Sequence, residues 1–387
     1  MEIEKQAIEL HEKLKGKLEV KSKVKIDSKE MLALAYTPGV AEPCKEIQSQ
    51  PDKVWKYTIK SDTIAVITDG SAVLGLGNIG AEASLPVMEG KCALFKELAG
   101  INAFPIAIKS QKTEEIVSVI KNISPVFGGI NLEDISSPRC FGIERQLQNL
   151  GIPVMHDDQH ATAIVVLAAL QNALKVVGKE MKDLKIVLNG IGAAGTAITK
   201  ILLAEEKPKE IILCDKQGIL FKGKTDMIEH HKELAEITNE KKVQGNLSDA
   251  LVGADVFIGV SAPNILSKKM IKSMNSKAIV FALANPIPEI SREDALDAGV
   301  EVFASGRSDD LNQVNNVLVF PGVFKGALNA KAKRINEEMK LAAAKALASC
   351  IDKPTKEKFI PSPLDKEVVK KISKAVEKTA IKSGAVK

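Results

Sequence analysis

Residues 184–195 read LKIVLNGIGAAG, and this stretch decides the fold of the second half of the chain. An apolar, strand-like run precedes Gly190, Gly192 and Gly195, and a helical run follows at once. Such glycines allow a tight turn in which backbone N–H groups approach a pyrophosphate at the positive end of the helix. The next strand-like run ends at Asp215, whose carboxylate can accept hydrogen bonds from ribose hydroxyls. The pattern predicts a Rossmann-type site for NAD or NADP, and the alternative is a tight turn packed by small residues.

Short apolar runs alternate with longer helical patterns on both sides of this stretch. Most of the runs are apolar throughout, which suits parallel strands that helices cover on both faces. The runs occupy residues 63–68, 103–108, 125–130, 152–155, 185–189, 211–215, 255–261, 278–282 and 301–304. The sequence therefore predicts an α/β fold with a Rossmann-type parallel sheet in its C-terminal half.

The length of 387 residues favours two or three domains, because a domain usually holds about 100 to 200 residues. A fresh sheet pattern begins after the loop at 155–162, so we place a boundary there. Residues 1–157 would form an N-terminal α/β domain, and residues 158–316 the Rossmann-type domain. Residues 317–387 contain Lys- and Ala-rich helical patterns split by prolines, and we expect them to pack back on the first domain and complete it.

The composition excludes several classes of protein. Apolar residues make up 45% and charged residues 27% of the chain, which argues against disorder. The net charge is +5, but lysines alternate with acids and aromatic residues reach only 4%, so no nucleic-acid partner is expected. The longest apolar run, residues 163–170, is shorter than the roughly 20 residues of a membrane span, so no membrane is expected. Five separated cysteines fit a reduced, cytoplasmic setting.

Two pairs of neighbouring acids follow strand-like runs: Glu133 with Asp134, and Asp157 with Asp158. Carboxylates crowded at one point repel one another, so they need a cation or a shared proton. An all-oxygen set suits Mg²⁺ or Mn²⁺. The alternative is that the four residues are solvated loop acids and helix caps.

His156 and His160 flank the second acid pair in the segment HDDQH. A spacing of four can present two imidazoles to zinc on one helix face, but no third soft ligand is evident. We expect instead that the two rings support the acids by hydrogen bonds.

A second glycine-rich loop, GLGNIG at residues 75–80, also follows a strand-like run. Pro86 is expected to interrupt the helix after it, and no acid ends the next strand. We therefore predict close backbone packing beside a substrate pocket and no second nucleotide site. Pocket residues should collect where the Rossmann strands end, as Ser261 and Asn285 do.

The chain resembles the malic enzyme family of the small bacterial type in eight segments. They are, in order, LAYTPGVAEPCKEI, TDGSAVLGLGNIG, MEGKCALFKELAGI, LEDISSPRCFGIE, IPVMHDDQHATA, NGIGAAG, ALANP and NQVNNVLVFPGVFKGAL. The resemblance runs from Tyr36 to Leu328. It implies metal-dependent oxidative decarboxylation of L-malate to pyruvate and CO₂ with reduction of NAD⁺ or NADP⁺, with catalysis in the N-terminal domain.

The resemblance also implies roles for single residues. Tyr36 would be the general acid and Lys91 the general base, and burial beside a cation should lower the pKa of Lys91, as a base requires. The other implied site residues are the Mg²⁺ or Mn²⁺ ligands Glu133, Asp134 and Asp158, the proton-network residue Asp157, the substrate or nicotinamide contacts Asn285, Asn315 and Asn316, and the cofactor loop Gly190, Gly192, Ala193, Ala194 and Gly195 with Asp215.

The chain departs from the family at one position of the substrate site. Larger members carry D-G-E-R before the second glycine loop, and the arginine binds a substrate carboxylate. This chain has Asp69, Gly70, Ser71 and Ala72 there, so another group must meet the carboxylate.

The family forms dimers or higher assemblies, so the resemblance implies a homodimer, with the apolar face of a helix at residues 1–18 as a contact. Whether Tyr36 serves its own subunit or a neighbour stays open. Cofactor choice is also open, because Asp215 favours NAD whereas Lys216, Lys222 and Lys224 could bind a 2′-phosphate. The rival functions are a malolactic enzyme, a non-catalytic Rossmann regulator and a metal-free 2-hydroxyacid dehydrogenase.

Overall fold

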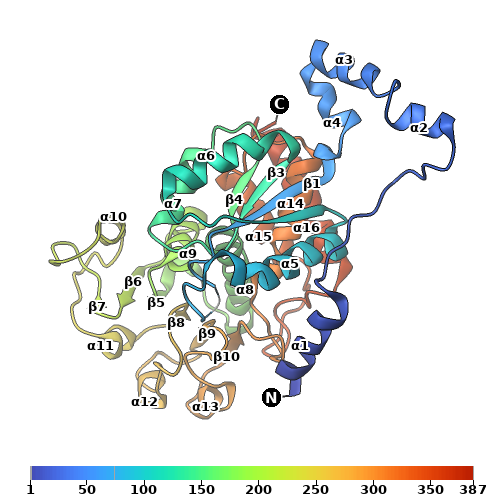
Figure 1. Cartoon of the computed structure of the whole chain (residues 1–387). Helices are drawn as coiled ribbons and strands as arrows, with labels where there is room; N and C mark the ends of the chain where they lie inside the picture. Colours follow the sequence, from blue (N-terminus) through green and yellow to red (C-terminus); the bar gives the residue numbers. More distant parts are fainter. Residues whose placement is uncertain (1, 74, 387) are drawn as a thin grey trace.

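The computed structural model describes the chain except for Met1, Leu74 and Lys387, and its strands form two sheets (Figure 1). The first sheet is parallel, in the order β2-β1-β3-β4. The second has the order β10-β9-β8-β5-β6-β7, and β7 pairs antiparallel to β6. The strands are β1 Thr63–Thr68, β2 Asn102–Ala107, β3 Gly129–Leu132, β4 Val154–His156, β5 Lys185–Asn189, β6 Glu210–Asp215, β7 Gly218–Ile219, β8 Val256–Gly259, β9 Ile279–Ala282 and β10 Val302–Ser305. The predicted α/β fold with a C-terminal Rossmann-type sheet is confirmed.

Helices cover the faces of both sheets, as their apolar strands require. The α-helices are α1 Glu2–Leu14, α2 Lys29–Ala35, α3 Ala41–Ser49, α4 Val54–Tyr57, α5 Gly80–Ala99, α6 Thr113–Ile123, α7 Arg139–Leu147, α8 Asp157–Val177, α9 Ala193–Glu205, α10 Glu229–Ile237, α11 Leu247–Leu251, α12 Lys268–Ile271, α13 Arg292–Asp297, α14 Phe320–Asn329, α15 Glu337–Ala348 and α16 Lys366–Lys382. Short 3₁₀ turns complete the regular structure: η1 Pro51–Lys53, η2 Ile59–Asp62, η3 Ser124–Val126, η4 Met181–Asp183 and η5 Asn316–Leu318.

Two details of the predicted elements are wrong. The run at residues 125–130 becomes a strand only from Gly129, because Ser124–Val126 form a 3₁₀ turn around Pro125, which has no N–H to give to a ladder. Pro86 does not interrupt the helix after β1 but lies inside α5. Apolar side chains of α5 such as Phe95 are buried, and this packing outweighs the single hydrogen bond that Pro86 removes.

The long helix α8 lies at the centre of the molecule. It is long and apolar enough to cross a membrane by length and composition, but most of it is buried against the rest of the chain. It packs on α9 and α15 and begins directly after β4. One continuous apolar cluster includes Ile64 of the first sheet and Ile186 of the second, with Ile164 of α8 also in it. The predicted boundary at residue 157 therefore falls at a helix start inside shared packing, and the domain limits stay a prediction.

The C-terminal helices pack on both halves of the chain. Helices α14 and α16 lie against each other and against α5, and α15 lies against α8 (Figure 1). Helices α14 and α16 approach closely: a Cβ on Gly322 would lie 2.7 Å from Cβ of Ile372, and one on Gly326 would lie 2.5 Å from the carbonyl oxygen of Ser373. Only glycine fits at such contacts.

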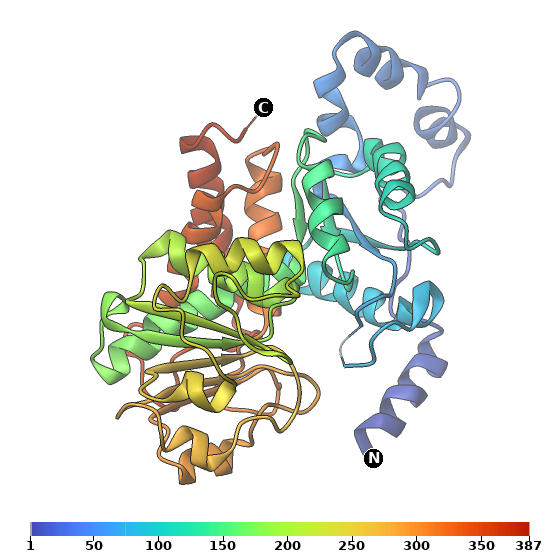
Figure 2. The same cartoon turned by 90° about the vertical axis from the view of Figure 1, so that its left-hand side faces the viewer.

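The N-terminal helices are exposed, and α2 and α3 together form an arm. The helix expected at residues 1–18 is α1, whose apolar side chains are exposed, with Ile3 77% accessible. No described residue of α2 or α3 is buried. Figures 1 and 2 show α2 and α3 standing away from both sheets. Helix α1 and the arm thus expose apolar side chains that the rest of the described chain does not cover.

Candidate functional site

The carboxyl end of the first sheet brings the two acid pairs together. Glu133 directly follows β3, and Asp157 directly follows β4 as the first residue of α8. Leu132 is paired with His156 in the parallel ladder, so the residues after them emerge side by side. The register of neighbouring strands, which sequence reasoning could not supply, therefore creates the cluster.

Three of these acids form a group that can hold a metal ion. Glu133, Asp134 and Asp158 each offer a carboxylate oxygen, and these oxygens lie within 4.8 Å of one another. The backbone N–H of Asp134 donates to Oδ2 of Asp158 at 2.9 Å. Oδ2 of Asp134 is buried and has no hydrogen-bond partner among the described residues. An orphaned buried oxygen in an all-oxygen set fits Mg²⁺ or Mn²⁺.

Burial and mutual repulsion shape the charge of this group. Burial raises the pKa of Glu133 well above its usual range, although Lys91 opposes this shift. Burial together with the charge of Asp158 raises the pKa of Asp134 to about 8. Burial also raises the pKa of Asp157. The charge of Lys91 thus does not offset the burial and mutual repulsion of these acids, and a divalent cation would supply further positive charge.

Lys91 of α5 stands between the acids of the two strands. Its Nζ donates to Oδ2 of Asp157 at 2.6 Å and lies 2.9 Å from Oε1 of Glu133. It also lies 4.3 Å from the ring centroid of Phe320, a cation–π contact at the start of α14. Burial acts to lower the pKa of Lys91, but the charges of Asp157, Glu133 and Asp158 outweigh it and raise the pKa above its usual value. Burial thus acts on the pKa of Lys91 in the expected direction, and the lowering expected from a bound cation stays a prediction.

The glycine loop of the second sheet has the shape of a dinucleotide cradle. A Cβ on Gly195 would lie 1.8 Å from the carbonyl oxygen of Gly190, and one on Gly190, whose φ is +105°, would lie 2.7 Å from that of Val260. Helix α9 begins at Ala193 immediately after the turn. The loop lies between β5 and β8, where the strand order reverses, and this is where such sheets bind nucleotides. The chain therefore fits NAD or NADP at this loop.

Asp215 lies at the end of β6, the next strand along the sheet from the glycine loop. Its Oδ1 accepts a hydrogen bond from the N–H of Gln217 at 2.7 Å, and Oδ2 lies 3.6 Å from Nδ1 of His231. Of the nearby lysines, Lys222 pairs with Glu236, and Lys224 donates to backbone carbonyls. Two of the three lysines proposed for a 2′-phosphate thus have other partners.

A central cavity of about 600 Å³ joins the acid cluster to the glycine loop. Seven of the fifteen residues that the resemblance implies line it, and Lys17 is an addition that sequence reasoning missed. The described residues that line it are Lys17, Gly75, Pro86, Val87, Gly90, Lys91, Leu94, Glu133, Asp158, Thr162, Ala194, Val260, Ser261, Leu283, Ala284, Asn285, Val314, Asn315, Asn316 and Val317.

Tyr36 is not among the described residues of this lining. It caps the C-terminal end of α2 in the arm and is 66% exposed. The structure therefore does not bring Tyr36 of the same chain to Lys91.

The two histidines do not behave as expected. Nε2 of His160 lies 3.0 Å from Oε2 of Glu144, and the backbone N–H of His156 donates to Oε1 of the same residue at 2.9 Å. Neither ring nitrogen of His156 has a hydrogen-bond partner among the described residues. The expectation that both rings support the metal-binding acids is wrong, because the His160 ring pairs with Glu144 of α7 and the His156 ring pairs with no described residue.

The second glycine loop packs as predicted beside the cavity. A Cβ on Gly75 would lie 2.7 Å from the carbonyl oxygen of Asn285 and 2.9 Å from Cδ of Pro286. The loop thus closes on the segment ALANP, and only a residue without a side chain allows this approach.

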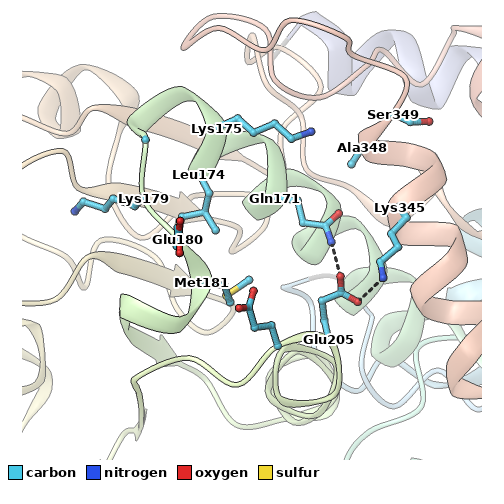
Figure 3. Close-up of a pocket in the computed structure, with 12 residues that line it drawn as sticks. Gln171, Leu174, Lys175, Lys179, Glu180, Met181, Glu205, Lys345, Ala348 and Ser349 are labelled. Carbon is cyan, nitrogen blue, oxygen red and sulfur yellow. Dashed lines mark hydrogen bonds and ion pairs between the residues drawn. The ribbon is translucent and has the colours of Figure 1, made fainter.

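A second hollow, of about 710 Å³, lies where the ends of α8 and α9 meet α15 (Figure 3). One ion pair joins two of its lining residues, Lys345 and Glu205, and Nε2 of Gln171 donates to Oε1 of the same glutamate. Lys179 and Glu180 pair with residues outside the hollow. None of the expected site residues lines it. This hollow therefore holds none of the side chains that the proposed chemistry uses.

Comparisons with known proteins match the whole chain. The family model for the malic enzyme N-terminal domain matches residues 15–148, and that for the malic enzyme NAD binding domain matches residues 160–382. The bifunctional malic/malolactic enzyme of Bacillus subtilis is 51% identical over 391 residues, which span 100% of this chain and 95% of that protein. The NAD-dependent malic enzyme of Geobacillus stearothermophilus is 52% identical over 96% of this chain and 78% of its own length.

Solved structures are similarly close. The crystal structure of an NAD-dependent malic enzyme from Thermotoga maritima superposes with a TM-score of 0.93 at 48% identity, covering 96% of this chain and 98% of that one. The malic enzyme from Pyrococcus horikoshii gives a TM-score of 0.94 at 46% identity, covering 100% of this chain and 92% of that one.

Proposed function

The chain belongs to the malic enzyme family, whose matching members depend on NAD or NADP, and we propose that it converts L-malate to pyruvate and CO₂ by oxidative decarboxylation. One observation carries this proposal: the acids Glu133 and Asp158, with Lys91 beside them, face Ala194 of the nucleotide loop across one cavity. A hydroxy acid bound there would have its C2 atom between a proton acceptor and a hydride acceptor.

Glu133, Asp134 and Asp158 would hold the divalent ion. Mg²⁺ or Mn²⁺ would supply the positive charge that offsets these acids, lowers the pKa of Lys91 and polarises the C2 oxygen of malate. The resemblance implies these three ligands, and the orphaned oxygen of Asp134 supports the assignment.

Lys91 would accept the proton of the C2 hydroxyl while the C2 hydrogen passes as hydride to NAD⁺ or NADP⁺. Asp157 holds Nζ of Lys91 in place at 2.6 Å and is the next group that can share the proton. Loss of the C4 carboxylate from oxaloacetate as CO₂ leaves an enolate, which needs a proton at C3. Asn285, Asn315 and Asn316 line the same space and would orient malate and the nicotinamide.

Tyr36 would donate the proton at C3, and we assign this role to Tyr36 of the partner subunit in a homodimer. In its own chain the tyrosine lies on an exposed arm outside the cavity. The uncovered apolar side chains of α1 and the arm support a surface that a second copy would cover.

A malolactic reaction is the second candidate function, because the Bacillus subtilis relative is named a bifunctional malic/malolactic enzyme. In that reaction the NADH formed stays bound and reduces pyruvate to lactate. Incubation of the purified chain with L-malate, Mn²⁺ and NAD⁺ tests both functions. Release of free NADH in step with pyruvate supports the first, lactate without free NADH supports the second, and no product of either kind contradicts both.

A further inference from the structure

The substrate site needs a positive group that the sequence pattern does not supply. L-malate carries two carboxylates, and the position that holds an arginine in larger family members is Ala72 here. We propose that Lys17 binds the C1 carboxylate of the substrate from the mouth of the central cavity. This inference rests on the proposed function and names the group that recognises its substrate.

The loop that carries Lys17 is fixed tightly to α5. The backbone N–H of Lys17 donates to Oε2 of Glu89 at 2.8 Å, and its Nζ donates to the carbonyl oxygen of Pro86 at 2.7 Å. The preceding Gly16 has φ +105°, and a Cβ there would lie 3.2 Å from the carboxylate of Glu89. A Cβ on Gly90 would lie 3.6 Å from Nζ of Lys17. The amine thus lies over the same helix face that presents Lys91 to the cavity.

Lys17 is the basic group at this cavity whose partners are not carboxylates. Among the described residues that line the space, the basic side chains are Lys17 and Lys91. Lys91 pairs with Asp157 and Glu133. Nζ of Lys17, in contrast, contacts the carbonyl of Pro86 and Nε2 of His11, the latter at 2.9 Å.

His11 does not cancel the charge of Lys17. Nδ1 of His11 lies 2.6 Å from the carbonyl oxygen of Ala7, which can only accept, so Nδ1 carries the proton and Nε2 accepts from Lys17. The ring is then neutral and orients the amine. The positive charge of Lys17 is available to an anionic ligand, and two neutral acceptors hold the amine at the cavity.

Arg139 does not fill the place of the missing arginine. Its Nη2 donates to Oδ2 of Asp69 at 2.7 Å and to Oγ of Ser71 at 2.8 Å, and Arg139 is not among the described residues that line the cavity. The guanidinium therefore holds the loop before Ala72 by hydrogen bonds and is not placed to bind the substrate.

The chemistry of the reaction selects the C1 carboxylate. This group keeps its negative charge from malate to pyruvate, whereas the C4 carboxylate leaves as neutral CO₂. A cation fixed to C4 would stabilise a charge that disappears in the transition state and would slow the step. A cation on C1 binds substrate and transition state alike, so its loss should raise KM more than it lowers kcat.

The test compares Lys17→Met with wild type, with Lys17→Arg as the charge-conserving variant and Lys15→Met as the control on the same loop. Steady-state kinetics give KM for L-malate and NAD⁺ and the inhibition constant of pyruvate. Calorimetry gives the affinity for L-malate in the presence of Mg²⁺ and without NAD⁺, and thermal unfolding shows whether each variant is folded.

We expect Lys17→Met to weaken the binding of L-malate and of pyruvate by about tenfold each, the scale of one charge-assisted hydrogen bond. KM for NAD⁺ should stay unchanged. Lys17→Arg should recover most of this loss, and Lys15→Met should behave as wild type. Three outcomes in folded Lys17→Met would each overturn the assignment. They are an unchanged affinity for malate, an equal loss of affinity for NAD⁺, and a loss of affinity for malate without a loss of affinity for pyruvate. Wild-type protein that does not turn over malate would contradict the proposed function instead, and the calorimetric comparison would still decide the role of Lys17.

Discussion

Nζ of Lys91 lies 2.6 Å from Oδ2 of Asp157, in a buried ion pair that ties α5 to the first residue of α8. Helix α8 packs on α9 of the second sheet, so this pair connects the acid cluster to the helix that both halves of the molecule share. The proposed base is thus fixed to the helix that both halves of the molecule share.

Lys91→Met should abolish turnover of malate, with a loss of at least about 10²-fold, because no proton acceptor remains at the C2 hydroxyl. It should also destabilise the fold by roughly 3 to 5 kcal/mol, since Glu133 and Asp157 lose their buried partner. Single-turnover kinetics and urea unfolding measure the two effects. Lys96→Met, on an exposed position of the same helix, is the control. Wild-type rates of malate turnover in folded Lys91→Met would show that Lys91 is not the general base.

Asp158→Asn should weaken the binding of Mn²⁺ by roughly a hundredfold, because one of three converging carboxylates loses its charge. Titration of the protein with Mn²⁺, followed by electron paramagnetic resonance, gives the dissociation constant without turnover. Asp183→Asn is the control, because this acid is exposed and lies outside the acid cluster, and it should leave the dissociation constant for Mn²⁺ unchanged. Equal Mn²⁺ affinity in wild type and Asp158→Asn would refute the ligand assignment.

Tyr36→Phe and Lys91→Ala subunits should rescue each other if the tyrosine serves the partner's cavity. Each variant alone should be nearly inactive. After free exchange of an equal mixture, half of the dimers are hybrids and each hybrid has one intact site, so about a quarter of wild-type activity should return. Activity after mixing and dilution measures this. If Tyr36 acts within its own subunit, no hybrid site is intact and the mixture stays inactive.

Gly195→Ala should abolish NAD⁺ binding and destabilise the protein, because the new Cβ would lie 1.8 Å from the carbonyl oxygen of Gly190. Gly142→Ala in α7 is the matched control: nothing lies within 4 Å of the added Cβ, and alanine should stabilise the helix by up to about 1 kcal/mol. Fluorescence of bound NADH and thermal unfolding distinguish the two. Tight binding of NADH by Gly195→Ala would contradict the assignment of this glycine loop as the dinucleotide-binding site.

Glu144→Gln should change how stability depends on pH. Burial alone would raise the pKa of Glu144, but His160 lowers it to about 2, from a usual 4.5. A carboxylate whose pKa is depressed by folding contributes stability above the pKa of the unfolded chain and loses it as pH falls toward the folded pKa. The advantage of wild type over Glu144→Gln should therefore shrink by roughly 1.4 kcal/mol between about pH 6 and pH 3.5.

Urea unfolding of both proteins at several pH values provides that comparison. A difference in unfolding free energy that stays constant over this range would show that the Glu144 carboxylate titrates alike in the folded and unfolded chains.

Local patterns in the sequence were enough for most of the strands and for the glycine turn. An apolar run followed by Gly190, Gly192 and Gly195 has few alternatives, because close backbone approach and a helix start both demand small residues there. The course of α5 through Pro86 was missed, since burial of its core face, a tertiary term, outweighs one lost hydrogen bond.

The sequence by itself determined the fold class, the nucleotide loop and which side chains have the chemistry for the reaction, because strand pattern, turn geometry and side-chain type are local properties. Only the tertiary structure decided which of them meet. The register of β3 against β4 placed Glu133 beside Asp157, and the packing of an N-terminal loop on α5 brought Lys17 to the cavity. The same packing left Tyr36 outside it. Distances between residues far apart in a chain depend on how its elements pack, and no local pattern encodes them.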